Sequence, residues 1–228
     1  MQKIEDTSQM GCVTEFQQSL PLSRISLNEF ERRLKKLLDP KQGDEISKKQ
    51  LVECFKDHYA FGEIADENSV VHKLLTDEVF QKGSNTTYHI PYLMLLGLLV
   101  CATNEHNKAD KFFELCQIEL NEKISHSDGE YVDYMPKILE IAYEVMIKHY
   151  LANNPGSKKD HWIKPQEKMA ELYGQIFEEL TEQLFMDGDS IVSALENDKF
   201  IDRFYKKFQE YLQAHKIRNI VFDKMAAA

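Results

Sequence analysis

The sequence predicts an all-α protein, and three observations support that prediction. Among 228 residues there are only nine glycines and six prolines, so few positions interrupt a helix. Apolar residues recur mostly at spacings of three and four, the period of an amphipathic helix, and strand-like alternation is nearly absent. With 43% hydrophobic residues, a chain of this length can bury the core of one large domain or of two small ones.

The first helix is predicted from a capping box and an apolar face. In the stretch "SLNE", Ser26 can accept a hydrogen bond from the third backbone amide while Glu29 reaches back to the cap. The helix that opens there carries apolar residues along one face as far as Leu38. Further helices are predicted on the same periodicity over residues 48–58, 69–80, 108–117, 131–151, 166–185 and 197–215.

The most apolar run, residues 90–102, is predicted to be a buried helix. It has thirteen residues, "IPYLMLLGLLVCA", whereas a membrane span needs roughly 20, so a membrane role is the disfavoured alternative. The amino-terminal "MQKIEDTSQ" lacks the basic-then-apolar layout of a signal peptide and the arginine-rich character of a transit peptide. A cytoplasmic location is expected, with cytoskeletal and ciliary settings left open.

Four polar turns separate these helices, and one longer loop interrupts them. The loop is "ANNPGSKKDHWIKP", residues 152–165, where Pro, Gly and Ser lie between two helical patterns. Aligned on a small apolar residue followed by a helix, the four turns are "DPKQGDEISKKQLVECF", "QKGSNTTYHIPYLMLL", "QIELNEKISHSDGEYVDYM" and "DGDSIVSALENDKFIDRF". Few folds alternate helix and polar turn in this way.

These turns resemble the helix-loop-helix units of the calmodulin superfamily, with a layout similar to calcineurin B-like and neuronal-calcium-sensor-like proteins. The resemblance implies an all-α fold of two pairs of EF-hand-like units, with an inserted loop and long C-terminal helices. Such loops take ligands from positions 1, 3, 5, 7, 9 and 12. An anchor at position 8, here Ile46 and Tyr88 in the first two loops, pairs two loops. The implied organisation is an N-terminal extension (1–25), a first pair (26–103), a second pair (104–215) containing the insertion (152–165), and a C-terminal tail (216–228).

The first two loops have lost most of their calcium ligands. Ca²⁺ takes about six or more oxygen ligands, and position 12 normally supplies a bidentate carboxylate. The first loop has Asp39 at position 1 and Ser47 at position 9, but positions 3, 5 and 12 hold Lys41, Gly43 and Gln50. The second loop has no carboxylate at these five positions, which hold Gln81, Gly83, Asn85, His89 and Tyr92.

The third loop is the best remaining candidate for a metal site, although a weak one, for Ca²⁺ or Mg²⁺. Its exiting helix fits better with Glu130 at position 12, which would make the loop two residues too long. The fourth loop can begin at Asp187, which favours ligation, or at Gly188, which favours packing, and the packing register is preferred. The five candidate ligands of the third loop are Gln117, Glu119, Asn121, Ser125 and Asp128.

No other pattern indicates catalysis or a cofactor. The eight histidines form no i, i+4 pair, and the four cysteines are scattered without a CxxC, so reduced thiols are expected. No Gly-x-Ser-x-Gly turn, Walker loop or dinucleotide fingerprint appears. The 28 basic residues against 38 acidic ones give a net charge of −10, which disfavours nucleic acid and favours a basic partner.

The predicted function is that of a non-catalytic adaptor or assembly subunit. It would bind a protein partner, either an amphipathic or basic helix or a larger complex, largely without calcium. Two alternatives remain: a calcium-responsive sensor that uses the third loop, with or without the fourth, and an unrelated helical-bundle scaffold. The single tryptophan lies in the inserted loop and either packs back onto the body or anchors a partner. The candidate partner-binding residues are Trp162, Met146, Tyr150, Phe204 and Phe208.

Overall fold

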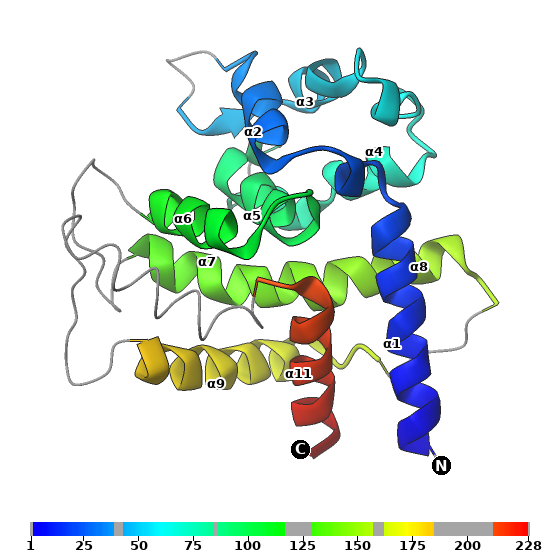
Figure 1. Ribbon diagram of the computed structural model, residues 1–228, viewed down its shortest axis with the longest axis vertical. Coiled ribbons are helices and arrows are strands. Elements are labelled where there is room, and N and C mark those ends of the chain that lie inside the picture. The colour runs from blue at the N-terminus through cyan, green and yellow to red at the C-terminus, as the bar shows by residue number, and fades with distance from the viewer. Residues whose placement is uncertain are drawn as a thin grey trace. The chain divides into compact units, whose positions relative to one another are not determined.

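Helices make up most of the structure, a computed structural model that describes residues 2–38, 43–83, 86–116, 129–156, 162–184 and 212–227 (Figure 1). Within these ranges there is also one sheet of two short strands. The all-α prediction is confirmed at this level. The chain divides into two compact units: unit 1 is Met1–Ala102 with Glu144–Lys159, and unit 2 is Thr103–Tyr143 with Asp160–Ala228.

Unit 1 begins with a helix, α1 (Gln2–Ser19), where the sequence predicts only an N-terminal extension. Met10 and Val13 of α1 and Leu20 just after it are buried, so the second half of the helix packs against unit 1. The other elements of unit 1 are η1 (Pro21–Arg24), α2 (Leu27–Lys35), β1 (Glu45–Ile46), α3 (Lys48–Phe55), η2 (Tyr59–Phe61), α4 (Val70–Leu75), η3 (Glu78–Phe80), β2 (Tyr88–His89), α5 (Ile90–Val100) and α8 (Met146–Asn153).

Half of the predicted capping box of α2 is present. Ser26 Oγ accepts a hydrogen bond from the Glu29 N–H at 3.2 Å, as predicted. The Glu29 carboxylate does not return to the cap but pairs with Arg32 at 2.8 Å and with Arg33 at 2.6 Å. A carboxylate bonds more strongly to a guanidinium than to a neutral amide, so the two arginines take the side chain that the cap would use.

The single helix predicted over residues 69–80 is in fact two elements, α4 and η3. The break lies at Thr76 and Asp77. Thr76 Oγ1 donates to the His72 carbonyl at 2.8 Å, and Asp77 Oδ1 accepts from the Val79 N–H at 3.1 Å. Threonine and aspartate side chains that bond to nearby backbone compete with the helix, and here they end one element and cap the next.

The apolar run predicted as a buried helix forms α5, and all eleven of its residues are buried within unit 1. Among the described residues, no helix is long and apolar enough to cross a membrane. Gly97 allows α5 to lie close to α2, because a Cβ at this position would be 2.8 Å from Cδ1 of Phe30. The absence of a side chain therefore fixes the spacing of these two helices.

Gly97→Ala is expected to destabilise the protein by about 1–3 kcal/mol, since the added methyl must displace the buried Phe30 ring. Chemical denaturation followed by circular dichroism measures the change. Gly11→Ala is the matched control: Gly11 is also helical, but nothing lies within 4 Å of its added Cβ. Alanine there should be neutral or stabilising. Equal effects of the two substitutions would contradict the close approach of α2 and α5.

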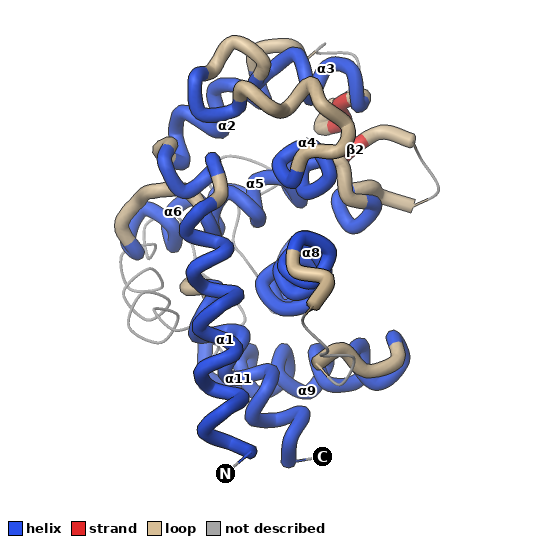
Figure 2. The backbone as a smooth tube through the Cα atoms, turned by 90° about the vertical axis from the view of Figure 1, so that its right-hand side faces the viewer, coloured by secondary structure: helices blue, strands red, loops and turns tan. Residues whose placement is uncertain are grey.

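α8 comes from far along the chain but belongs to unit 1, where it lies beside α1 and α4 (Figure 2). Its Met146, Ile147, His149 and Tyr150 side chains are buried. The Tyr150 ring meets Phe16 of α1 edge-on, with 6.0 Å between the ring centroids. This helix therefore completes the core of unit 1.

Unit 2 contains α6 (Glu105–Cys116), α7 (Gly129–Glu140), α9 (Gln166–Leu184) and α11 (Ala214–Ala227). α7 lies beside α6, α9 and α11. The helix predicted over 197–215 falls almost entirely outside the described residues, and α11 covers most of the predicted C-terminal tail.

The helix predicted over residues 131–151 is helical throughout but contains a π-helical segment, Ile141–Val145, after α7. In unit 2, Arg218 of α11 is fully buried and its Nη1 donates to the Ala142 carbonyl at 3.2 Å. Burial lowers the pKa of Arg218 to about 10. Within unit 2, the buried guanidinium thus bonds to Ala142, the second residue of the π-helical segment.

Candidate functional site

The first two predicted loops meet in a short antiparallel sheet. β1 (Glu45–Ile46) pairs with β2 (Tyr88–His89), and Ile46 lies opposite Tyr88. These are the two residues predicted at the anchor position of each loop, and both are buried. The sheet therefore joins two segments that are 42 residues apart in the sequence at their apolar anchors.

Two further hydrogen bonds extend this contact between the loops. The Ile90 N–H donates to the Asp44 carbonyl at 2.8 Å. Thr87 Oγ1 donates to Glu45 Oε2 at 2.6 Å. Hydrogen bonds to a charged acceptor are stronger than neutral ones, so the Thr87 contact helps to hold the register of the two short strands.

In the first loop, the residues at positions 9 and 12 bind each other. The N–H and the hydroxyl of Ser47 both donate to Gln50 Oε1, at 3.0 and 2.7 Å, and the Gln50 N–H donates to Ser47 Oγ at 3.3 Å. Together they form a complete capping box at the start of α3. The oxygen of the position-12 side chain is therefore already used by the helix cap.

The other end of the Gln50 amide bridges the loop. Gln50 Nε2 donates to the Leu37 carbonyl, just before the loop begins, at 3.3 Å. One neutral side chain thus connects the end of the incoming helix to the first turn of the outgoing one. In a calcium-binding loop, a carboxylate and the ion make that connection together. Here an amide can make it without metal.

The second loop uses an aromatic pair at the same two positions. The rings of His89 and Tyr92 meet edge to face, with centroids 4.6 Å apart and planes at 77°. Both side chains are buried at the start of α5. Such a pair contributes packing energy and supplies no anionic oxygen. In both loops, then, the side chains at positions 9 and 12 contact each other.

The candidate metal ligands of the third loop, Gln117, Glu119, Asn121, Ser125 and Asp128, lie outside the described residues, as do both registers of the fourth loop. Within the described ranges, no three His, Cys, Asp or Glu side chains are grouped so that they could hold a metal ion. The metal site in the third loop therefore stays a prediction.

The candidate partner-binding residues that the structure describes are buried. In unit 1, Met146 is fully buried and Tyr150 is 9% exposed, both on α8. In unit 2, the Trp162 side chain is fully buried, which favours packing onto the body over an exposed anchor. Its backbone carbonyl accepts a hydrogen bond from the Tyr143 hydroxyl at 2.8 Å. Phe204 and Phe208 lie outside the described residues.

A buried polar cluster in unit 1 holds α8 to the start of η3. His149 Nε2 donates to Asp77 Oδ2 at 2.8 Å, and Lys148 Nζ lies 3.0 Å from the same oxygen. Burial by itself raises the pKa of Asp77, but hydrogen bonds from His149, the Val79 N–H and Lys148 outweigh burial and lower that pKa to about 2. The carboxylate is therefore ionised at neutral pH and serves as an acceptor for three donors.

A surface groove in unit 1 contains the more exposed of the two exposed large hydrophobic residues found in the described part of the chain. Tyr59 of η2 is 85% exposed. It lines a cavity of about 410 Å³ together with Phe16, Leu20, Pro21, Glu63 and Val70, among others, and we call this feature the Tyr59 groove. Its lining comes from the end of α1, from η1 and η2, and from the start of α4. This volume is typical of a ligand-binding pocket.

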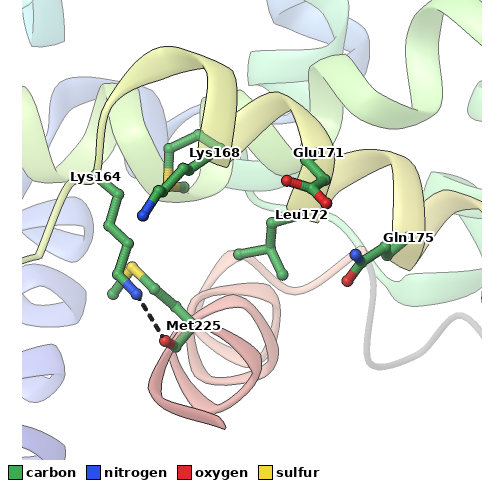
Figure 3. Close-up of a pocket in the computed structure, with 7 residues that line it drawn as sticks. Lys164, Lys168, Glu171, Leu172, Gln175 and Met225 are labelled. Atoms are coloured by element: carbon green, nitrogen blue, oxygen red, sulfur yellow. Dashed lines mark hydrogen bonds between the residues drawn. The ribbon is translucent and has the colours of Figure 1, made fainter. Parts of the chain in front are cut away.

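A smaller cavity of about 230 Å³ lies in unit 2 between α9 and α11 (Figure 3). Leu172, Met169 and Met225 give it an apolar lining. Lys164 closes one side by donating to the Met225 carbonyl at 3.0 Å, and Glu171 lies at the other side. Lysine and glutamate side chains both line this cavity, so it favours neither an anionic nor a cationic ligand. The Tyr59 groove, whose lining includes one charged residue, is the more selective of the two cavities.

Sequence reasoning missed both Tyr59 and the Asp77–His149 pair. Tyr59 lies in "DHYAFGEI", where an aromatic pair sits between polar residues in a short connection. That stretch could have marked a candidate surface anchor. Asp77 and His149 are 72 residues apart and belong to no local pattern, so only the packing of α8 against unit 1 brings them together.

Comparison with known proteins found no match for this chain among protein-family models, curated proteins or solved structures. The resemblance to the calmodulin superfamily therefore stays an interpretation of the four turns. The function of this chain is inferred from its own residues and their contacts.

Proposed function

We propose that this chain is a non-catalytic adaptor or assembly subunit of EF-hand-like architecture, which binds a protein partner and keeps its first two loops folded without calcium. The proposal rests on the hydrogen bonds of the Gln50 side chain. Both ends of its amide are bonded within the protein, to Ser47 and to the Leu37 carbonyl. A position-12 side chain engaged in this way is neutral and supports the loop by itself.

The pairing of the two loops also supports an EF-hand-like module. Ile46 and Tyr88 lie opposite each other in the sheet, at the anchor positions inferred from the sequence. The His89–Tyr92 ring pair stabilises the second loop in the place where a metal ligand would be needed. A metal-independent pair of units needs its apolar anchor residues but not its calcium ligands. The first two loops keep the anchors and lack most of the ligands.

A role in protein binding is supported by the Tyr59 groove. A tyrosine that is 85% exposed beside an apolar cavity is a common feature of interaction sites, because its ring gives a large contact area with few rotatable bonds. The described residues suggest no alternative chemical role for this groove, whose lining includes one charged residue, Glu63. An exposed aromatic ring beside a cavity therefore supports a protein-binding role.

Gln50→Ala is expected to destabilise unit 1 by about 1–2 kcal/mol, because the cap of α3 and the bridge to Leu37 are lost together. The loss should be the same in EDTA and in Ca²⁺, measured by chemical denaturation of the full chain. Lys49→Ala, an exposed neighbour in the same helical turn, is the control and should change stability little.

One result would contradict this proposal. If Ca²⁺ stabilises the wild type but not Gln50→Ala, the first loop binds metal and the proposal is wrong. Titration calorimetry with Ca²⁺ and Mg²⁺ adds a direct readout: saturable heat near micromolar Ca²⁺ would replace the adaptor with the calcium-responsive sensor. Absence of heat up to millimolar concentrations would exclude the sensor.

A further inference from the structure

The exposure of Tyr59 sets it apart from the other large hydrophobic residues of unit 1. Among the described residues, the exposed large hydrophobics are Tyr59 at 85% and Val132 of unit 2 at 41%. The Tyr59 ring stacks on His58, with centroids 4.6 Å apart, so the side chain has a rigid support on one side. A supported and exposed aromatic ring loses little conformational freedom when a partner covers it.

The cavity beside Tyr59 has the character of a pocket for one bulky apolar side chain. Leu20 and Val71 are nearly fully buried and form apolar parts of its lining. Phe16 adds an aromatic surface that is held in place by its edge-on contact with Tyr150. These groups are fixed by the core of unit 1, so the pocket is formed before any partner arrives, which lowers the cost of binding.

The charge in the lining of the Tyr59 groove is acidic. Glu63 is the charged residue of its lining. The segment that contributes Tyr59, residues 57–67, also contains Asp57, Asp66 and Glu67 and has no lysine or arginine. Glu67 is paired with Lys48 at 3.1 Å and Asp66 Oδ1 accepts from the Asn68 N–H at 2.9 Å, so Glu63, in the lining itself, is the acidic group that a ligand in the groove would meet. An apolar pocket with acidic residues nearby selects a basic, amphipathic ligand.

We infer that the Tyr59 groove binds a basic amphipathic segment of a partner protein. The segment places one bulky apolar side chain in the cavity beside Tyr59 and a lysine or arginine near Glu63. This inference rests on the proposed adaptor function and names the chemistry of its partner. The groove lies outside the two paired loops, so partner binding requires no change in the Ile46–Tyr88 sheet.

The test uses the full chain and a fluorescein-labelled helical peptide of leucine and lysine with its leucines on one face. We expect saturable binding by fluorescence anisotropy, and Tyr59→Ser should weaken it by about tenfold or more. Val132→Ser removes the other exposed large hydrophobic residue and is the matched control, with affinity unchanged. Because both side chains are exposed, circular dichroism should show that both variants remain folded.

The charge requirement is tested separately. Glu63→Gln should weaken binding by a smaller factor, about threefold, and reduce its dependence on salt concentration. Glu78→Gln, an exposed acid on η3, is the control and should leave both unchanged. A second peptide, with glutamate in place of each lysine, should bind at least about tenfold more weakly than the first.

Several results would overturn the inference. Equal affinities of the lysine and glutamate peptides would exclude charge selection, and equal effects of Tyr59→Ser and Val132→Ser would exclude the groove. A concentration-dependent dimer that Tyr59→Ser abolishes would assign the groove to a second copy of this chain. If the peptide does not bind while Gln50→Ala behaves as expected, this inference is refuted and the proposed function is not. Saturable calcium binding would instead refute the proposed function.

Discussion

Replacement of Trp162 by alanine is expected to destabilise unit 2 by about 3–5 kcal/mol, a large fraction of the stability of a typical domain. Trp162 is fully buried, and its removal leaves a cavity that the neighbouring side chains can fill only in part. The Tyr143 hydroxyl, which donates to the Trp162 carbonyl at 2.8 Å, keeps its acceptor because that group belongs to the backbone. The loss is therefore one of packing.

The measurement is chemical denaturation followed by circular dichroism, because Trp162 is the only tryptophan and the variant has no indole fluorescence. Tyr59→Ala is the control: it also removes an aromatic side chain, but one that is 85% exposed, and should change stability by no more than about 0.5 kcal/mol. If Trp162→Ala left stability unchanged and only weakened partner binding, Trp162 would be an interface anchor.

Asp77→Ala is expected to cost unit 1 about 3 kcal/mol. The substitution removes the cap of η3, worth about 1 kcal/mol, and leaves the buried His149 Nε2–H without its acceptor, which costs about 1–3 kcal/mol. Lys148 is 54% exposed and contributes little, since water replaces its partner. Chemical denaturation of the full chain measures the effect.

Two controls separate the buried acceptor from general effects at this position. Asp77→Asn keeps an oxygen that can accept from Val79 or His149, so it should cost clearly less than alanine. Glu78→Ala changes the exposed residue next to it and should be close to neutral. If all three substitutions had the same effect, the Asp77–His149 contact would not contribute to stability.

The Asp77 contribution should also depend on pH in a defined direction. Its pKa in the folded protein is about 2, lower than the ordinary value of 3.8, so folding is linked to release of a proton. The stabilisation is complete above pH 3.8 and is lost as the pH falls from 3.8 to about 2. The stability difference between wild type and Asp77→Asn should therefore be constant near neutral pH and shrink below pH 3.8.

Several helices follow from the sequence because their signals are local. α9 is predicted within one residue of its observed bounds, and α5 and α6 are predicted closely, because caps and apolar spacing lie within each segment. α1 was not predicted as a helix, although Met10 and Val13 within it are buried. α4 was drawn too long, because the competing bonds of Thr76 and Asp77 to the backbone are not visible in the periodicity.

The candidate site was only partly predictable. The predicted anchors Ile46 and Tyr88, and the lack of a carboxylate at Gln50 and Tyr92, are local features of the sequence, and Ile46 and Tyr88 do meet in the sheet. The bridge from Gln50 to Leu37 is not evident from the sequence, because it depends on how the loop closes. Exposure is the least predictable property: Tyr59 and Trp162 are both aromatic, yet one is 85% exposed and the other fully buried.

By itself, the sequence determined the helical class of this protein, the positions of several helices and the absence of an acidic side chain at Gln50 and Tyr92 of its first two polar turns. These properties depend on residue type and short-range spacing, which each segment carries with it. The tertiary structure alone decided that α8 completes unit 1, that Asp77 meets His149, and that Tyr59 is exposed beside a cavity. Burial and contact depend on residues far apart in the chain, so the exposure of Tyr59 and the cavity beside it became identifiable only after the helices were packed.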